Sequence, residues 1–302
     1  MSCLVLALAA MPALARAEVP KVVTDIPPVQ SLVAQVMGDL GAPALLLTPG
    51  TNAHSYQMKP SQARALQDAD LLIWIGPEMT PWLNRAAAAS GAKNSLPLLH
   101  TKGTQLRDYA PEADHDHDHD HEEDGHHHEG TDPHAWLDPD NARTWLSTIA
   151  QHLAALDPEH AETYAANAEA ARTRIAALDG ALKDELAPVA RRPFVVFHAA
   201  YGYFAAHYGL DVAGALSLGD AAEPGAAHLA ELRAGLAHDA VACAFPEANH
   251  DPRPLDRLAE GTGVRIGGAL DPEGSKLDAG PDLYDRILRS LSETIRDCLT
   301  QE

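Results

Sequence analysis

The sequence predicts an α/β protein built from two Rossmann-like (βα)4 lobes that are joined by one long rigid helix. Three observations lead to this fold class. Apolar, β-branched runs alternate with segments of helical periodicity in both halves of the 302-residue chain, as in parallel sheets flanked by helices. A single stretch rich in Ala, Glu, Arg and Leu, residues 159–186, separates the two halves. Finally, 46% hydrophobic residues suffice for two cores, and chains of this length commonly form two domains.

The first lobe is expected to hold four strands with helices between them. Apolar residues recur at helical spacing from Val29 to Val36, which predicts a helix that Gly38 ends. Ser61 is placed to cap a helix that runs to residue 67, and Pro81 is placed to open a helix that runs to residue 89. The expected strands are residues 21–26, 44–48, 71–75 and 96–99.

The second half repeats this pattern after the long helix. A helix over residues 140–156 ends before Asp157-Pro158, a cap followed by a proline suited to a first turn, and the long helix then extends roughly 40 Å. Strands are expected at 194–197, 210–216, 240–245 and 264–270, and helices at 201–208, 226–237, 254–260 and 283–299. The chain therefore divides into 1–17, a first lobe at 18–157, the linker helix at 158–187 and a second lobe at 188–302.

The N-terminus predicts export. Residues 4–15 form an apolar run that is too short for a bilayer, which needs about 20 residues, and the small-x-small site Ala15-Arg16-Ala17 follows it. We interpret residues 1–17 as a signal peptide, which places the mature protein in the periplasm. Because no lysine or arginine precedes the apolar run, a buried N-terminal helix is the alternative.

The cysteines fit an oxidising compartment. Cys3 would leave with the signal peptide, and two cysteines would remain: Cys243 on an expected strand and Cys298 on the terminal helix. An even number in an exported protein indicates one disulfide, which would hold the last helix against its own lobe. Two unpaired buried thiols are the alternative.

The charge distribution limits the possible partners. A net charge of -21 argues against nucleic acid and suits a protein that attracts cations. Residues 112–130 alone hold nine of the 43 acidic residues and seven of the 17 histidines, and have no apolar face, so we expect this segment to be disordered. Its imidazoles are candidate weak metal ligands: His115, His117, His119, His121, His126, His127 and His128.

Three other histidines are candidates for a stronger site. His54 follows a strand in a polar loop, His134 lies between the acidic segment and a helix, and His198 ends a strand; Asp271 follows the strand at 264–270. Ligands of open α/β sheets bind outside the carboxyl ends of the strands, which predicts a metal site in the cleft between the lobes. Three imidazoles with one carboxylate suit zinc, copper, iron or nickel.

Spacing alone does not select these three histidines, because a single histidine in a loop is commonly a surface residue. His207 is interpreted as packing beside two tyrosines, or at most as a support of the site. Six further histidines stand in polar contexts and are interpreted as surface residues: His100, His152, His160, His228, His238 and His250.

Longer motifs carry a family resemblance. They are HSYQMKPSQARAL, TDPHAWLDPDNAR, FHAAYGYFAAHYGL and VACAFPEANHDPRPLDRLAEGTGVRIGGALDPEG. From about residue 22 to its end the chain resembles the solute-binding proteins of metal ABC transporters (cluster A-I, family 9), and specifically their periplasmic zinc-binding component. The resemblance implies that His54, His134 and His198 bind zinc and that Asp271 lies at the site. Manganese-binding relatives have a carboxylate in place of His198, which favours zinc here.

The fourth ligand stays open between Asp271 and water. Some zinc-binding members have an acidic residue directly before the first histidine, but that position is Ala53 in this chain. A carboxylate would offset part of the charge of the ion, which favours Asp271, although LDPEG is also a turn sequence.

The resemblance further implies a monomer without catalytic activity, which delivers zinc to an ABC membrane permease. The chain has no P-loop, so the ATPase must be a separate subunit, and a periplasmic zinc chaperone is a further candidate partner. The alternatives are a solute-binding protein for manganese or another divalent metal, an adhesin, or a zinc hydrolase, although there is no HExxH motif.

Zinc-binding relatives also carry a His-rich insertion just before the second ligand. We expect residues 112–130 to collect zinc weakly near the mouth of the site and to pass it to His54, His134 and His198. A dispensable insertion and a sensor that slows uptake are the alternatives.

Overall fold

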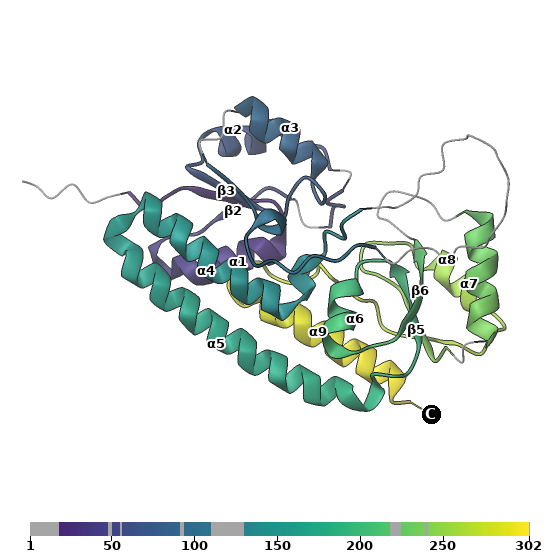
Figure 1. The fold of residues 1–302 in the computed structure, drawn as a ribbon. Helices are drawn as coiled ribbons and strands as arrows, with labels where there is room; N and C mark the ends of the chain where they lie inside the picture. The colour runs from purple at the N-terminus through teal and green to yellow at the C-terminus, as the bar shows by residue number, and fades with distance from the viewer. Residues whose placement is uncertain are drawn as a thin grey trace, which may run out of the picture.

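The computed structural model describes residues 18–47, 50–54, 56–90, 94–109, 130–217, 225–238 and 241–301. Two α/β lobes lie side by side, and the long helix α5 (Ala161–Leu186) runs along both of them (Figure 1). The expected signal peptide and the seven histidines of the acidic segment lie outside the described residues. Within the described ranges, no helix is long and apolar enough to cross a membrane.

The N-terminal lobe contains a four-stranded parallel sheet with the order β2-β1-β3-β4. Its strands are β1 (Val22–Thr24), β2 (Ala44–Leu45), β3 (Leu71–Trp74) and β4 (Ser95–Pro97). Its helices are α1 (Pro27–Met37), α2 (Pro60–Gln67), α3 (Pro81–Ser90) and α4 (Pro139–Leu156). Short 3-10 turns are η1 (Gly38–Leu40), η2 (Leu98–His100), η3 (Ala135–Leu137) and η4 (Pro158–His160).

The C-terminal lobe repeats this topology with the strand order β6-β5-β7-β8, again all parallel. Its strands are β5 (Phe194–His198), β6 (Val212–Ser217), β7 (Cys243–Phe245) and β8 (Arg265–Ile266). Its helices are α6 (Gly202–Tyr208), α7 (Ala226–His238), α8 (Arg253–Ala259) and α9 (Leu283–Leu299), and η5 (Ala187–Val189) precedes β5. Each lobe thus has a four-stranded parallel sheet with the same strand order, and one long helix lies between the lobes in the chain. The predicted fold class is therefore confirmed.

Most strands are shorter than the sequence predicts, and three edge strands illustrate the difference. The runs at 44–48 and 264–270 form only the two-residue strands β2 and β8, which lie at sheet edges with a single partner strand. The run at 96–99 leaves the sheet at Pro97 and continues as η2. Apolar content marked these segments correctly, but it did not indicate where the backbone leaves the sheet, as it does at Pro97.

The start of α2 corrects the prediction that Ser61 is its cap. The cap and the helix start lie two residues earlier than predicted: the helix begins at Pro60, whose ring fixes a helical φ and whose missing N–H needs no partner at the first position. Lys59 is the capping residue, and its backbone N–H donates to Oε1 of Gln62 at 2.6 Å. The Gln62 amide also donates to the hydroxyl of Tyr56 (2.8 Å) and to the carbonyl of Leu46, which ties α2 to the loop region after β2.

The helix α5 is continuous over 26 residues, about 39 Å at 1.5 Å per residue. Its N-terminal half packs on the first lobe, where Asn167 donates to the carbonyl of Val36 at 3.0 Å and Arg174 donates to Gln35 at 3.0 Å. Its C-terminal end lies beside α9 (Figure 1). One stiff element therefore contacts both lobes.

The helix α9 adds a second connection between the lobes. The hydroxyl of Ser31 on α1 donates to the carbonyl of Pro281 at 2.9 Å and accepts the backbone N–H of Tyr284 at 3.0 Å. Tyr284 in turn donates its hydroxyl to the carbonyl of Trp136 (2.8 Å), and the Trp136 indole donates to the carbonyl of Pro272 (2.8 Å). One buried apolar cluster contains residues of both lobes. Large rotations between the lobes would break this shared core.

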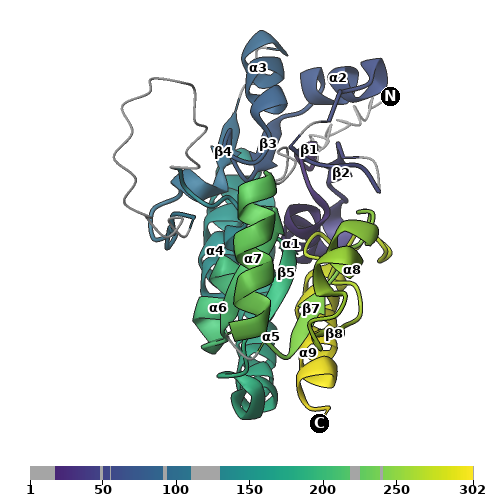
Figure 2. The ribbon, with the colours of Figure 1, turned by 90° about the vertical axis from the view of Figure 1, so that its right-hand side faces the viewer.

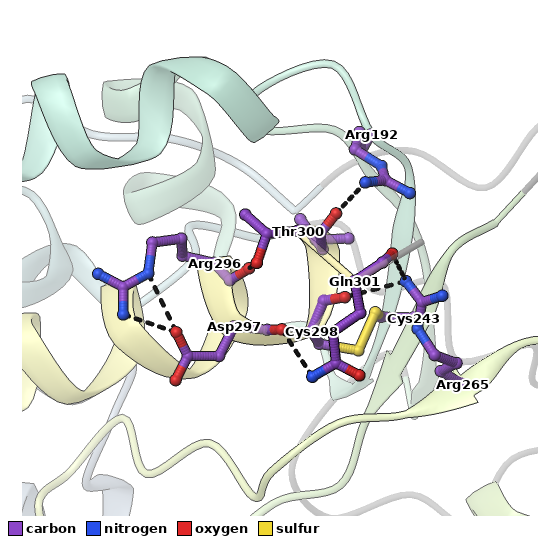
Figure 3. The surroundings of a disulfide bond; sticks show 9 residues. Arg192, Cys243, Arg265, Arg296, Asp297, Cys298, Thr300 and Gln301 are labelled. Atoms are coloured by element: carbon purple, nitrogen blue, oxygen red, sulfur yellow. Dashed lines mark hydrogen bonds and ion pairs between the residues drawn. A yellow bond between two sulfur atoms is a disulfide. The ribbon is translucent and has the colours of Figure 1, made fainter.

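The predicted disulfide is confirmed: Cys243 on β7 is bonded to Cys298 on α9, 55 residues later (Figure 3). Two arginines cover the same end of α9. Arg265 donates to the carbonyls of Cys298 at 3.0 Å and Gln301 at 2.6 Å, and Arg192 donates to that of Leu299. Cationic groups at the C-terminus of a helix satisfy its last carbonyls and oppose its dipole, so the terminal helix is held both covalently and electrostatically.

His207 on α6 forms two ion pairs. The sequence analysis had interpreted it as a residue that packs beside two tyrosines, or at most as a support of the site. Its Nε2 lies 2.7 Å from Oδ1 of Asp179 on α5, and its Nδ1 lies 3.1 Å from Oδ1 of Asp138, the capping residue of α4. Burial alone would lower the pKa of the imidazole, but the two carboxylates outweigh it, so the pKa of His207 is raised. Burial would raise the pKa of Asp179, yet its hydrogen bonds to Lys183 and His207 lower it. The imidazolium therefore joins three helices.

Removal of the disulfide is expected to lower the free energy of unfolding by about 4 kcal/mol, because the bridge closes a 55-residue loop in the unfolded chain. Urea unfolding of the Cys243→Ser/Cys298→Ser double variant measures this loss. Wild-type protein under reducing conditions is the control and should unfold at the same urea concentration as the double variant. Equal stability of the oxidised wild type and the double variant would contradict the expectation.

His207→Gln is expected to lower the free energy of unfolding by roughly 2 kcal/mol at pH 6 and by less at pH 9. A group whose pKa is raised by folding stabilises fully below its unfolded pKa, near 6.5, and this contribution disappears as the pH rises through the folded pKa. Urea unfolding of the zinc-free proteins at both pH values measures the difference. His152→Gln, an exposed change on α4, is the control; an equal loss at pH 6 and pH 9 would disprove the ionic role.

Candidate metal centre

His54 reaches the cleft from the loop after β2. Its backbone N–H donates to Oδ1 of Asn52 at 2.8 Å. The preceding carbonyl, of the buried Ala53, accepts the indole N–H of Trp82 on α3 at 2.7 Å. Because the loop is held on both sides, the half-buried imidazole has a defined position without help from a neighbouring strand.

His134 is held by Asp132, which the sequence analysis did not single out. Oδ1 of Asp132 accepts both the backbone N–H of His134 at 2.9 Å and its ring Nδ1–H at 2.7 Å. Both side chains are almost fully buried, at 2% and 3% exposure. A carboxylate can only accept here, so the proton of the ring lies on Nδ1 and Nε2 carries the lone pair.

His198 is held in the same way from the other lobe. It is the last residue of β5, and its Nδ1 lies 2.6 Å from Oε2 of Glu247, which follows β7. The hydroxyl of Tyr201 donates to the same oxygen at 2.9 Å. Glu247 is the second residue that the sequence analysis missed, although its place after a strand of the parallel sheet satisfied the rule that selected the other candidates.

The structure brings the three predicted histidines together. Nε2 of His134 and Nε2 of His198 lie 3.4 Å apart, and the ring centre of His54 lies 5.8 Å from that of His134. Two nitrogen ligands of a tetrahedral zinc ion, each bonded at 2.0–2.1 Å, are about 3.3 Å apart. Since both Nδ1 atoms face carboxylates, the two Nε2 lone pairs converge at the spacing that one zinc ion requires.

A cavity of about 80 Å³ opens onto this point between the lobes. Residues 50–52 and His54 line it from the N-terminal lobe, whereas His198, Glu247 and residues 271–273 are among its walls on the C-terminal lobe. The backbone of Glu247 pairs with that of Leu270, which brings Asp271 to the same end of the C-terminal sheet as Glu247. The cleft predicted from the ends of the strands therefore exists and contains polar walls from both lobes.

Asp271 lies in this cavity but also organises its own turn. Its carboxylate accepts the backbone N–H groups of Ser275 and Lys276, each at 2.9 Å, and the hydroxyl of Ser275 at 3.2 Å. These bonds match the alternative reading of LDPEG as a turn. Asp271 lines the same cavity as His54 and His198, so it is a candidate ligand, and its hydrogen bonds also stabilise the turn that follows it.

A second cluster of potential ligand atoms lies away from the cleft. Single ligand atoms of Asp138, Asp140 and His207 lie within 4.8 Å of one another. Each is already engaged: the His207 imidazole lies between two carboxylates, and Asp140 pairs with Arg143 at 2.8 Å. We interpret the cluster as the ionic junction described above.

Comparisons with known proteins show the relatives of this chain. The family model for ZnuA, described as "Zinc-uptake complex component A periplasmic", matches residues 22–298. A high-affinity zinc uptake system protein ZnuA from Paracoccus denitrificans is 53% identical over 96% of this chain and 94% of its own length. The ZnuA protein of Brucella suis is 35% identical over 93% and 92%. A solved structure of a zinc-bound ZnuA deletion mutant, 25% identical, aligns with a TM-score of 0.76 over 94% of this chain and 99% of that one.

Proposed function

The chain belongs to the family of periplasmic zinc-uptake complex component A proteins, and from this premise we propose that the centre between its lobes holds the transported zinc ion. The family makes the protein a periplasmic zinc-binding component of an ABC uptake system, which captures zinc and delivers it to a membrane permease. Zinc is thus the cargo of the protein, bound and released without covalent chemistry.

One observation carries the assignment of the ligands: the 3.4 Å separation of Nε2 in His134 and His198, with a carboxylate behind each ring. We propose that these two nitrogens and the imidazole of His54 replace water molecules of the hydrated ion. The carboxylates of Asp132 and Glu247 orient the rings and make them better donors. They also supply negative charge close to a divalent cation that the lobes remove from water.

The fourth position is assigned to Asp271, with water as the alternative. Asp271 lines the same cavity as His54 and His198, which supports its assignment. Ligation would require its carboxylate to share an oxygen between the ion and the N–H groups of Ser275 and Lys276. A water molecule held by Asp271 would fill the same place without breaking the turn.

The donor set favours zinc over manganese. Imidazole suits zinc, whereas manganese prefers carboxylate and other oxygen ligands, and three of the four proposed positions are nitrogen. A catalytic zinc site keeps one position open for substrate. With Asp271 as the fourth ligand no position stays open, so we propose that the centre has no hydrolytic activity.

The remaining partners follow from the family and from the chain. We propose that the ATPase is a separate subunit, since the sequence has no P-loop, and that the protein acts as a monomer that a periplasmic chaperone can load. We also propose that residues 1–17 are removed after export and that the lobes begin at residues 18 and 188, with residues 158–187 as the linker.

Replacement of both central histidines is expected to abolish tight zinc binding. In the His134→Gln/His198→Gln variant the affinity should fall more than about 100-fold, because two of the ligand nitrogens are lost. Metal content after dialysis and competition with a chromogenic chelator measure the effect, with His152→Gln as the control. A folded double variant that keeps one tightly bound zinc ion would show that the centre is elsewhere.

The same titration distinguishes the two candidates for the fourth ligand. His54→Ala should weaken binding whichever candidate is correct. Asp271→Asn should weaken it strongly only if the carboxylate itself is the ligand, since an amide is a poor ligand for zinc. The amide oxygen still accepts one of the two backbone N–H groups of the turn, and a melting curve of the variant checks that the turn is kept.

Deletion of residues 112–130 tests the proposal that the acidic histidine segment collects zinc. The deletion variant should retain its single tight site, lose weakly bound zinc and load more slowly when zinc is scarce, because the local supply of ions falls. Stopped-flow loading at submicromolar zinc and metal counting measure these effects. A matched variant keeps the length and all acidic residues but replaces the seven histidines with asparagine. If the deletion changes neither the amount of weakly bound zinc nor the loading rate, the segment does not collect zinc.

A further inference from the structure

His250 lies at the mouth of the zinc cavity, although its polar sequence context indicated an ordinary surface residue. It is the last residue of a turn that starts at Glu247, closed by the backbone N–H of His250 and the carbonyl of Glu247 at 3.3 Å. Asn249 within this turn has a left-handed backbone (φ 66°) and donates its side-chain amide to Ser275 at 2.6 Å. The turn is therefore fixed to the loop that follows Asp271.

The ring of His250 faces the centre but remains partly accessible. Its centre lies 4.7 Å from that of Phe197 and 6.1 Å from that of His198, and 29% of its side chain is exposed. Phe197 covers one side of the imidazole, while His54, His198 and His250 all line one cavity. Among the described residues that line this cavity, His250 is a third imidazole besides His54 and His198.

Glu247 connects His250 with the buried centre. Its Oε2 binds the ring of His198 and the hydroxyl of Tyr201, whereas its Oε1 lies 3.5 Å from Nε2 of His250. Nitrogen and oxygen ligands bonded to one tetrahedral zinc ion at 2.0–2.2 Å are about 3.4 Å apart. The pair formed by His250 Nε2 and Glu247 Oε1 thus has the spacing of two ligands of one ion. A cavity of about 80 Å³ has room for that ion with part of its water shell.

We propose that His250 Nε2 and Glu247 Oε1 form an outer zinc position, which receives the hydrated ion before His198, His134 and His54 bind it. This inference rests on the proposed function of the centre. A zinc ion that moved directly from solvent to buried imidazoles would lose water before it gained ligands, which is costly for a divalent cation. At the outer position one imidazole and one carboxylate oxygen replace two waters while the remaining waters stay bound. The ion then exchanges these ligands for the inner nitrogens.

The proposal makes a kinetic prediction that differs from that of a ligand of the final site. A position on the path lowers the barrier in both directions, so its loss should slow zinc uptake and zinc release together. In His250→Gln both rates should fall by about tenfold, while the equilibrium affinity changes less than about twofold. Gln keeps the size and polarity of the partly exposed side chain, so the fold should be preserved, and a melting curve verifies this.

Stopped-flow transfer of zinc from a weak chelator to the zinc-free full-length protein measures uptake, and transfer to excess EDTA measures release. His152→Gln, which also removes one exposed histidine, is the matched control and should behave as the wild type. An unchanged uptake rate in His250→Gln would overturn the proposal. So would a weaker affinity with faster release and normal uptake, because His250 would then act only by holding Glu247.

The failure of the proposed function would give a different result in the same experiment. If the zinc centre is not at His134 and His198, the double variant at those positions keeps the tight site and the wild-type kinetics. If the centre is correct but the outer position is not, the double variant loses tight binding while His250→Gln takes up zinc at the normal rate.

Discussion

The geometry of the proposed zinc centre depends on two bonds between a carboxylate and an imidazole. Asp132 and Glu247 each accept the Nδ1 proton of a buried histidine, and so each sets which ring nitrogen faces the cleft. Without them, either ring could rotate or change tautomer, and the 3.4 Å approach of the two Nε2 atoms would not be defined. The pair of Asp132 and His134 is local, because the two residues are separated by one residue in the chain. The pair of Glu247 and His198 depends on the C-terminal sheet, because Glu247 follows β7 whereas His198 ends β5.

Much of this arrangement was accessible from the sequence, and the limits have physical causes. Alternating strands and helices gave the fold class, the rule for strand ends placed His198 and Asp271 in the cleft, and the motifs pointed to His54 and His134. Asp132 and Glu247 were missed because a carboxylate that supports a ligand has no spacing signature of its own. The edge strands were drawn too long because composition reports apolar content, whereas strand length depends on neighbours that are distant in sequence.

The connections between the lobes explain why the centre can be nearly preformed. The helix α5 contacts both lobes, α9 adds hydrogen bonds to α1, and one apolar cluster contains residues of each half. Figure 2 shows α9 alongside β7 and β8, with its C-terminal end at the same lower end of the molecule as α5. With the lobes coupled in this way, zinc exchange is expected to rely on local movement of loops and side chains more than on wide opening of the cleft.

The contacts of Ser31 also bear on the order in which the chain can reach its native state. Its partners, Pro281 and Tyr284, lie 250 and 253 residues further along the chain. A polypeptide that crosses a membrane N-terminus first would deliver the first lobe long before the segment that completes its packing. The first lobe would therefore have to wait in a partly assembled form, with the part of α1 that faces α9 uncovered, until the last helix had been translocated.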